Sequence, residues 1–226
     1  MSTAYDEILA ALHAQADAER APQQRAYLKS ERDFLGVTLP VLRREVTAVL
    51  GSRAIVEHDA TIALAIELWD GPYFECRLAA VMVLVAGRAT LVPADLDLLE
   101  SLIRGAETWA LVDELAATVT GTIIEAYPEE CAAVLDRWSI DPDSFWIRRS
   151  SLLALLIPLR RGAGDWERFC RYADSMLDER EFFIRKAIGW VLRDTSKRRP
   201  EMVRDYVTPR MDRLSGVTRR EAVKYL

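Results

Sequence analysis

Apolar residues recur every three or four positions along most of this chain, which is the period of helices that bury one face. From about residue 58 onward, glycines and prolines divide the pattern into helix-sized pieces. No piece shows the strict alternation that is typical of a strand. The periodicity predicts helices near residues 59–69, 73–86, 94–104, 108–126, 129–138, 144–160, 165–178, 181–196, 200–214 and 217–226.

Successive predicted helices pair as helix, turn, helix units. The first members of successive pairs begin about every 36 residues, the spacing of a unit that repeats and stacks on its neighbour. We therefore predict an all-α fold, a HEAT-like α-solenoid of stacked antiparallel helix pairs with a concave surface for an extended partner such as a DNA duplex. An irregular helical bundle is the alternative, because the period is shorter than in standard HEAT repeats and no residue-level repeat is visible.

The N-terminal region departs from this pattern. The segments Pro22 to Lys29 and Phe34 to Val37 interrupt it before a helix opens at Thr38-Leu39-Pro40, with Thr38 as the cap and Pro40 in the first turn. We predict one domain over residues 1–226, with an N-terminal helical cap over 1–57 and repeat pairs over 58–226.

The composition narrows the chemistry that this fold can carry. Of 226 residues, 50% are hydrophobic and 29% are charged, which is typical of a globular protein. The three cysteines lie far apart with no CxxC pair, and the two histidines, His13 and His58, lie in separate segments. These patterns leave no thiolate zinc site and little for a histidine metal site or a Ser/His/Asp triad, so we predict no metal and a reducing compartment.

Other signatures are also missing from the sequence. GxGxxG and GxxxxGK[ST] do not occur, which predicts no nucleotide cofactor. No run of about 20 uncharged apolar residues is present that would span a membrane. The N-terminus, acidic at Asp6 and Glu7, has no signal-peptide pattern. We expect a cytoplasmic monomer that needs no cofactor and does not contact a membrane.

Charge is distributed unevenly along the chain. The net charge is -5, but residues 1–143 hold 11 Lys and Arg against 24 Asp and Glu, a net charge of -13, while residues 144–226 hold 19 against 11, a net charge of +8. A basic C-terminal third in an acidic chain can direct one surface toward nucleic acid. Equally, its arginines can form ion pairs on solvent-exposed helix faces.

Trp109 and Asp113 are the first candidates for chemistry. They lie four residues apart in the predicted helix 108–126 and share a face that differs from its core-like positions. This spacing places an indole and a carboxylate side by side. For an isolated pair the structural explanation is favoured, with Trp109 in the core and Asp113 near the helix start as a cap or ion-pair partner.

Later segments place aromatic and basic residues together. Trp146 and Arg149 lie three residues apart at a predicted helix start, a location suited to anions, although a solvent-facing arginine pair explains Arg148 and Arg149 as well. Trp69 and Trp138 are assigned to the core. In the predicted helix 181–196 and just beyond it, one basic and aromatic stripe at helical spacing contains Lys186, Trp190, Arg193 and Lys197.

Five segments in order along the chain carry a family likeness. They are Arg25-Ala26-Tyr27-Leu28-Lys29, Phe34-Leu35-Gly36-Val37, Trp109 with Val112-Asp113, Trp146-Ile147-Arg148-Arg149, and Phe183-Ile184-Arg185-Lys186-Ala187-Ile188-Gly189-Trp190-Val191-Leu192-Arg193. With these segments the chain resembles the AlkD-type DNA alkylation repair glycosylases from about residue 5 to its end. The last segment, eleven consecutive residues, is the most specific.

The resemblance implies HEAT-like repeats and a DNA glycosylase that removes cationic alkylated purines, chiefly 3-methyladenine and 7-methylguanine, from double-stranded DNA. It implies Asp113 as the catalytic carboxylate, with Trp109 and Trp190 as aromatic walls at the lesion. It also implies that the damaged base stays in or near the stack rather than being flipped out. The DNA contacts that we assign from the resemblance and the basic stripe are Tyr27, Arg148, Arg149, Lys186, Arg193 and Lys197.

Two details qualify the resemblance. The family often has an aromatic residue before its tryptophan and an acid after it, where this chain has Thr108 and Ala110, so substrate range or rate can differ. The spacing from Trp146 favours Arg149 over Arg148 as the cation that binds the DNA backbone beside the site.

One carboxylate suffices chemically, because a purine alkylated in this way is already cationic and leaves without a proton. Positive charge then develops on the deoxyribose, and a carboxylate about 4 Å away, at an effective dielectric near 20, stabilises it by roughly 4 kcal/mol, about a thousandfold in rate. No covalent lysine is required, so we predict a monofunctional glycosylase. The alternative is a non-catalytic HEAT-like module that binds DNA or protein, which has no reason to keep Asp113 beside an indole.

Overall fold

The protein is described by a computed structural model that covers residues 3–53 and 57–226. It is 75% helical. Over the described residues there is no strand, and an isolated bridge joins Asp33 to Tyr73. The helices form two compact units, residues 1–91 and residues 92–226. The predicted all-α class is therefore confirmed.

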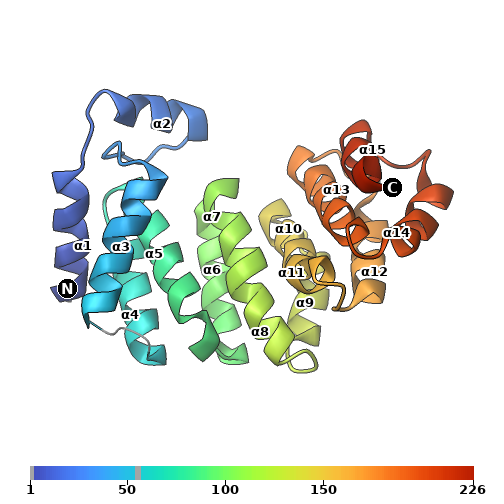
Figure 1. Ribbon diagram of the computed structural model, residues 1–226, viewed down its shortest axis with the longest axis horizontal. Coiled ribbons are helices and arrows are strands. Elements are labelled where there is room, and N and C mark those ends of the chain that lie inside the picture. The colour runs from blue at the N-terminus through green and yellow to red at the C-terminus, as the bar shows by residue number, and fades with distance from the viewer. Residues whose placement is uncertain (1–2, 54–56) are drawn as a thin grey trace. The chain divides into compact units, whose positions relative to one another are not determined.

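The first unit is built on two pairs of packed helices (Figure 1). Its elements are α1 (Thr3–Ala14), α2 (Arg20–Leu28), α3 (Leu39–Arg53), α4 (His58–Trp69), α5 (Phe74–Gly87) and the short η1 (Arg88–Thr90). The helices α1 and α3 pack against each other, and α4 packs against α5. Their apolar stripes meet in a core where Leu12, Leu42 and Leu68 are fully buried.

Helix α2 is an element that the sequence pattern did not predict. Pro22 suggested an interruption, but it is the third residue of the helix, in the first turn, where a missing backbone N–H removes no helical hydrogen bond. The Asp17 carboxylate accepts hydrogen bonds from the backbone N–H groups of Glu19 (3.0 Å) and Arg20 (2.9 Å), which supports this helix start. The helix ends at Leu28, and the next residue, Lys29, has a left-handed backbone with φ 52°.

The segment Phe34 to Val37 has a structural explanation in the first unit. The buried Glu75 carboxylate on α5 accepts hydrogen bonds from the backbone N–H groups of Leu35 (3.1 Å), Gly36 (2.8 Å) and Val37 (3.1 Å). Gly36 has φ +82°, and a Cβ there would lie 2.1 Å from the Asp17 carbonyl oxygen, so a glycine is required. This part of the family likeness therefore maintains the fold of the first unit.

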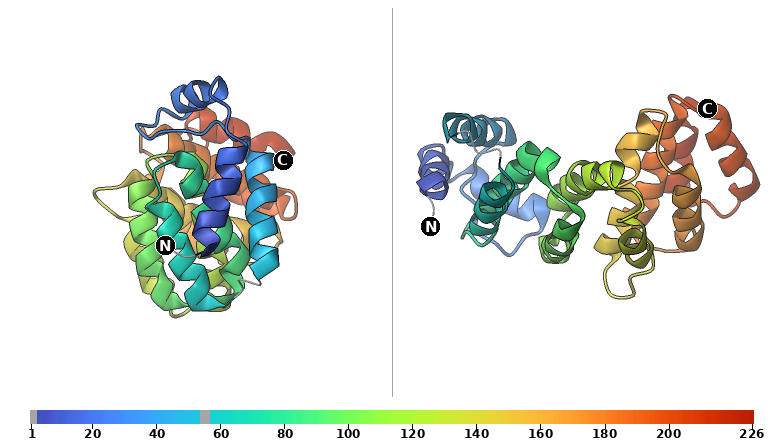
Figure 2. Two further views of the ribbon diagram at one scale, coloured as in Figure 1. Left: turned by 90° about the vertical axis from the view of Figure 1, so that its left-hand side faces the viewer. Right: turned by 90° about the horizontal axis from the view of Figure 1, so that it is seen from below.

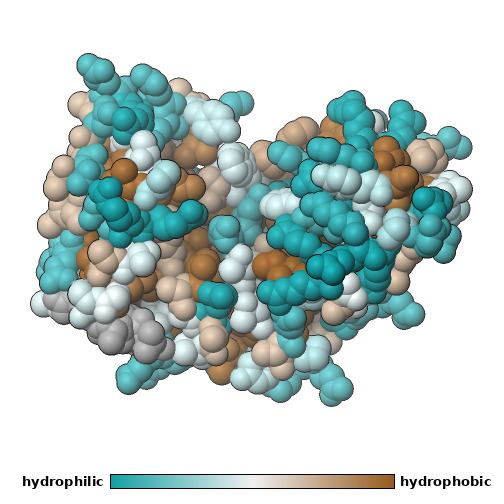
Figure 3. Space-filling model, in the orientation of Figure 1, coloured by the Kyte–Doolittle hydropathy of each residue, from teal (hydrophilic) through white to brown (hydrophobic). Residues whose placement is uncertain are grey.

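The second unit contains a longer run of helices that lie beside one another (Figures 1 and 2). Hydrophilic side chains gather over the part of it that holds α10, α11 and α13 (Figure 3). Its elements are η2 (Pro93–Asp95), α6 (Leu96–Ala106), α7 (Trp109–Glu114), η3 (Leu115–Thr120), α8 (Gly121–Ala126), α9 (Ala132–Ser139), α10 (Phe145–Leu153), α11 (Leu156–Arg160), α12 (Trp166–Met176), α13 (Phe182–Ser196), α14 (Pro200–Val207), η4 (Thr208–Arg210), α15 (Gly216–Ala222) and η5 (Val223–Tyr225).

Prolines explain where the predicted helices divide. The predicted helix 144–160 breaks between α10 and α11, because the ring of Pro158 clashes with the carbonyl four residues earlier, at Ala154, and supplies no N–H. The predicted helix 200–214 ends at Val207 for a related reason, since Pro209 follows two residues later and a 3₁₀ turn replaces the α-helix. Each predicted helix from residue 59 onward otherwise has a helical counterpart.

The predicted helix 108–126 contains a π-helical segment. After α7 ends at Glu114, the backbone follows π geometry over η3 and returns to α geometry in α8. A π segment adds a residue to the turn and rotates the helix that follows it, and such segments are frequent at functional sites. The face of α7 that carries Trp109 and Asp113 is therefore rotated about the helix axis relative to the faces of α8.

Two tryptophans confirm the predicted core. Trp69 is 7% exposed and Trp138 is fully buried, with its indole N–H donating to Glu100 Oε2 at 2.7 Å. The predicted boundary at residue 57 lies inside the first unit, next to residues 54–56, which are outside the described residues. The division of the chain into one domain with an N-terminal cap stays a prediction. The concave DNA-binding face also stays a prediction.

Candidate active site

Asp113 and Trp109 lie on one face of α7 in the second unit. The Thr108 hydroxyl caps the helix start and accepts a hydrogen bond from the Ala110 N–H at 3.4 Å. Trp109 is 40% exposed, whereas the Asp113 side chain is 19% exposed. Asp113 is thus mostly enclosed and reaches the surface beside a large exposed indole.

Arg149 fixes the Asp113 carboxylate from α10. Its Nε donates to Oδ1 and its Nη2 to Oδ2, both at 2.9 Å, in a bidentate pair. A third donor, Nη1, binds the Phe183 carbonyl oxygen. The Arg149 side chain is only 1% exposed, so this guanidinium lies behind the carboxylate rather than at the surface.

This position changes the role that we assign to Arg149. The family likeness implies a contact with the DNA backbone, but a guanidinium that is buried and bound to both oxygens of Asp113 does not reach a phosphate in this arrangement. The structure instead supports a role in holding Asp113. Burial lowers the pKa of Arg149, and the Asp113 charge acts in the opposite direction; arginine stays charged at neutral pH regardless.

The charge state of Asp113 follows from the same surroundings. Burial raises the pKa of its carboxyl above the ordinary value, while the charges and hydrogen bonds of Arg149 and the charge of Lys186 counteract the rise. Lys186 on α13 is exposed, and its Nζ lies 5.9 Å from the centroid of the Phe182 ring. The structure therefore brings Asp113, Arg149 and Lys186 into one electrostatic group, and Trp109 shares a face of α7 with Asp113.

Trp190 lies one turn beyond Lys186 on the same helix. Its side chain is half-buried, and its indole N–H donates to Asp194 Oδ2 at 3.1 Å. Residues four apart on a helix share a face. Trp190 therefore follows Lys186 along the side of α13 that carries the charge acting on Asp113.

The remaining predicted cations are all engaged in ion pairs. Arg148 binds Glu179 through Nε and Nη2, both at 2.9 Å, and donates to the Asp141 carbonyl at 2.6 Å. Its side chain is 19% exposed, which fits a structural tie better than a DNA contact. Arg193 binds Glu221, and Lys197 binds Asp194 Oδ1 at 3.0 Å while keeping 45% of its side chain exposed.

The sequence as a whole matches a known family. The match is to the family of DNA alkylation repair enzymes, over residues 8–226. This chain belongs to that family. Membership of this family gives the protein a role in DNA repair and implies that it binds DNA. Among curated proteins, no sequence matches the chain.

Solved structures share the fold of this DNA alkylation repair enzyme at low sequence identity. A predicted DNA alkylation repair enzyme from Enterococcus faecalis is 22% identical, with a TM-score of 0.82 over 94% of this chain and 97% of the other. AlkD2 from Streptococcus mutans is 15% identical, with a TM-score of 0.60 over 91% and 98%. The protein smu.31 from Streptococcus mutans UA159 is 16% identical, with a TM-score of 0.59 over 82% and 92%. At these identities the likeness shows the helical fold.

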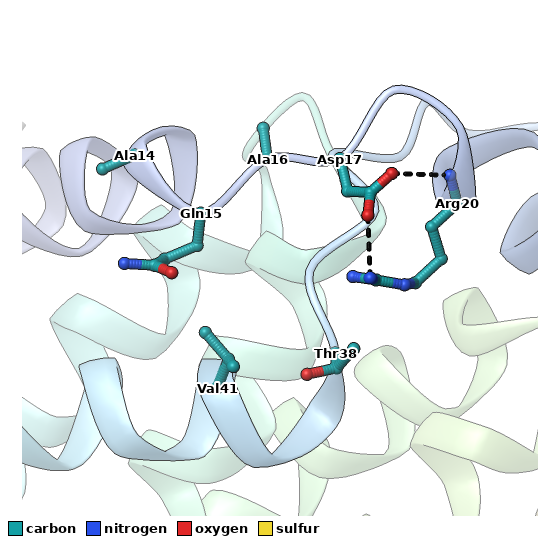
Figure 4. Close-up of a pocket in the computed structure, with 7 residues that line it drawn as sticks. All are labelled: Ala14, Gln15, Ala16, Asp17, Arg20, Thr38 and Val41. Atoms are coloured by element: carbon teal, nitrogen blue, oxygen red, sulfur yellow. Dashed lines mark hydrogen bonds and ion pairs between the residues drawn. The ribbon is translucent and has the colours of Figure 1, made fainter.

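Tyr27 lies in the first unit of the repair enzyme, on α2, where it is 74% exposed. The same unit has an open pocket of about 410 Å³ beside the start of α2 (Figure 4). Its ion pair joins Arg20 Nη2 to Asp17 Oδ2 at 2.7 Å. The pocket is lined by Ala14, Gln15, Ala16, Asp17, Arg20, Thr38 and Val41. A contact between Tyr27 and DNA stays a prediction.

The described residues hold no cluster of three or more His, Cys, Asp or Glu that fits a metal ion. No helix in the described ranges is long and apolar enough to cross a membrane.

Two side chains linked to Trp190 were missed from the sequence: Asp194, which accepts from its indole N–H, and Arg160, which binds Asp194. Asp194 had a signal, its spacing of four residues from Trp190, whereas Arg160 comes from another helix and had none.

Proposed function

We propose that this repair enzyme is a monofunctional DNA glycosylase. It hydrolyses the N-glycosidic bond of cationic alkylated purines, 3-methyladenine and 7-methylguanine, in duplex DNA. The observation that carries the proposal is the Asp113 carboxylate, held by both oxygens on a buried Arg149 and partly exposed beside Trp109. The negative group faces outward and the positive group lies behind it.

This arrangement suits the charge that develops as the bond breaks. A cation about 4 Å from the carboxylate lies about 8 Å from the guanidinium behind it, so at a dielectric near 20 the attraction of roughly 4 kcal/mol is offset by about 2 kcal/mol of repulsion. The pair as a whole then stabilises the sugar cation by about 2 kcal/mol, close to thirtyfold in rate. Asp113 also orients the water that attacks C1′.

The indoles add to this stabilisation. The face of a tryptophan attracts a nearby cation by about 1 to 2 kcal/mol when the site is partly desolvated. Trp109 is exposed enough to contact a nucleotide. Trp190 lies one turn beyond Lys186, on the same face of α13. Exposed cations such as Lys186 and Lys197 bind phosphates around the lesion, which places the sugar against these rings.

The test is the release of free base from defined duplexes. We expect the protein to release 7-methylguanine from a duplex that contains it and to leave an abasic site that is cleaved only after alkali. A matched duplex with 8-oxoguanine, a neutral lesion, should stay intact, because its base would have to leave as an anion, whereas the cationic 7-methylguanine leaves as a neutral base. Absence of base release would favour a non-catalytic DNA-binding module, and strand cleavage without alkali would indicate a Schiff-base lyase instead.

A further inference from the structure

Asp194 is a buried carboxylate at the centre of a charged cluster. It lies near the end of α13 with 4% of its side chain exposed. Burying a carboxylate in this way is costly unless it is paired and hydrogen-bonded. Both of its oxygens are shared, since Oδ2 accepts from Arg160 and Trp190 and Oδ1 from Lys197 and Arg193.

The distances rank these partners. Arg160 Nε donates to Oδ2 at 2.8 Å, and Lys197 Nζ donates to Oδ1 at 3.0 Å. The Trp190 indole N–H reaches Oδ2 at 3.1 Å, and the Arg193 contact is longer, at 3.4 Å. Three cations thus surround a single carboxylate, which stays ionised and fixed in place.

The hydrogen bond from the Trp190 indole N–H links the buried Asp194 to an aromatic ring of the proposed site. Trp190 is half-buried, and the indole N–H of such a tryptophan needs a hydrogen-bond acceptor, which Asp194 supplies. A hydrogen bond to a charged acceptor is shorter and stronger than one to a neutral group. Because Asp194 is held by other helices and residues, this bond restricts rotation of the indole before any substrate arrives.

We propose that Asp194 is a positioning residue that orients the Trp190 indole through its N–H. The inference rests on the proposed function, in which Trp190 forms an aromatic wall at the lesion. Because the carboxylate is negative, its hydrogen bond with the indole N–H also raises the electron density of the ring. The ring then attracts a cation more strongly. Asp194 therefore contributes to base release without touching the substrate.

The kinetic test compares Asp194→Asn, Trp190→Phe and the double variant. Phenylalanine keeps an aromatic face and removes only the donor and part of the ring. In single-turnover release of 7-methylguanine at saturating protein, we expect each single variant to lose about tenfold in rate. The double variant should lose no more than the slower single variant, because both changes remove one interaction. Losses that multiply would overturn the proposal.

A matched control separates positioning from simple bridging of helices. Arg160→Gln removes the cation that ties α11 to Asp194 and leaves the indole bond in place. We expect its rate at saturating protein to stay within about twofold of the wild type. If Arg160→Gln slows release as much as Asp194→Asn, the carboxylate acts by holding α11 and α13 together, and the proposal fails.

A second readout does not depend on activity. In ¹H–¹⁵N spectra the Trp190 indole signal is assigned by its loss in Trp190→Phe, and Asp194→Asn should shift it and speed its exchange with solvent. An unchanged signal would overturn the positioning role. A wild-type protein that releases no base would remove the proposed function, and this spectrum would still test Asp194. Should Asp194→Asn not fold, an undiminished rate in Trp190→Phe contradicts the inference.

Discussion

Asp113 and Asp194 are two aspartates of the second unit, one partly exposed and one buried, and both are bound by arginine. Their surroundings shift the carboxyl pKa in opposite directions. Burial raises the pKa of Asp113 despite Arg149 and Lys186. Burial acts to raise the pKa of Asp194 as well, but hydrogen bonds from Lys197 and Arg160 outweigh it, and its pKa lies below the ordinary value. At Asp113 burial outweighs the nearby cations, whereas at Asp194 the cations in contact outweigh burial.

The exposure of the partners differs too. Arg149 is 1% exposed behind a carboxylate that is 19% exposed, so the negative group faces outward. Around Asp194 the order is reversed, because Arg160 is 44% exposed and the carboxylate 4%. One cluster therefore presents an anion to its surroundings, as a developing sugar cation requires, and the other presents cations. Similar residues in a reversed arrangement carry different tasks.

The largest expected effect is on catalysis. Asp113→Asn removes a charge of -1 at about 4 Å from the sugar and leaves Arg149 unpaired, so single-turnover release of 7-methylguanine should fall about a thousandfold. Removing both charges in Asp113→Asn with Arg149→Gln should cost only about thirtyfold, because the repulsive cation is then lost as well. The double variant is thus expected to be faster than the single one.

A neighbouring carboxylate provides the control for this prediction. Glu114 follows Asp113 directly but is exposed and accepts a hydrogen bond from the Thr118 hydroxyl at 2.7 Å. Glu114→Gln should keep the wild-type rate within about twofold, since an exposed charge is screened by solvent. Equal losses of rate in Glu114→Gln and Asp113→Asn would mean that any negative charge near α7, rather than the carboxylate held by Arg149, supports the reaction.

The next effect is on stability. Arg149→Gln leaves the Asp113 carboxylate without its partner, and breaking a buried pair lowers the free energy of unfolding by about 3 to 5 kcal/mol. Arg160→Gln should cost about 1 kcal/mol or less, because Arg160 is largely exposed and other cations still contact Asp194. Urea denaturation measures both. Similar costs at the two positions would show that the clusters do not differ as described.

The sequence predicted more of the Asp113 cluster than of the Asp194 cluster. The residues of the first were identified from the family likeness and from the spacing of Trp109 and Asp113, but the sequence did not show that Arg149 faces Asp113 from 36 positions away. That contact depends on how α10 packs beside α7. Most helices were predictable from local periodicity, and α2 was missed because Pro22 suggested an interruption. The π segment after Asp113 and the Arg160 contact are not visible in local periodicity.

The smallest effect is on DNA binding. Lys186→Ala should weaken binding to an undamaged duplex several-fold and reduce the slope of log affinity against log salt by about one, because one phosphate contact is lost. Arg148→Gln is the comparison, since Glu179 and the Asp141 carbonyl already occupy its guanidinium. Its slope should equal that of the wild type. An unchanged slope in Lys186→Ala would remove Lys186 from the DNA-binding surface.

The pH dependence of base release tests the role of Asp113 most directly, because protonation removes its charge without replacing the side chain. Protonation removes the negative charge, so the single-turnover rate should be level above the pKa of Asp113 and fall about tenfold per pH unit below it. Because burial raises that pKa, the midpoint should lie above the ordinary value of about 3.9. After subtraction of spontaneous base loss, Asp113→Asn should show no such fall. A level wild-type profile, or the same fall in Asp113→Asn, would contradict the account.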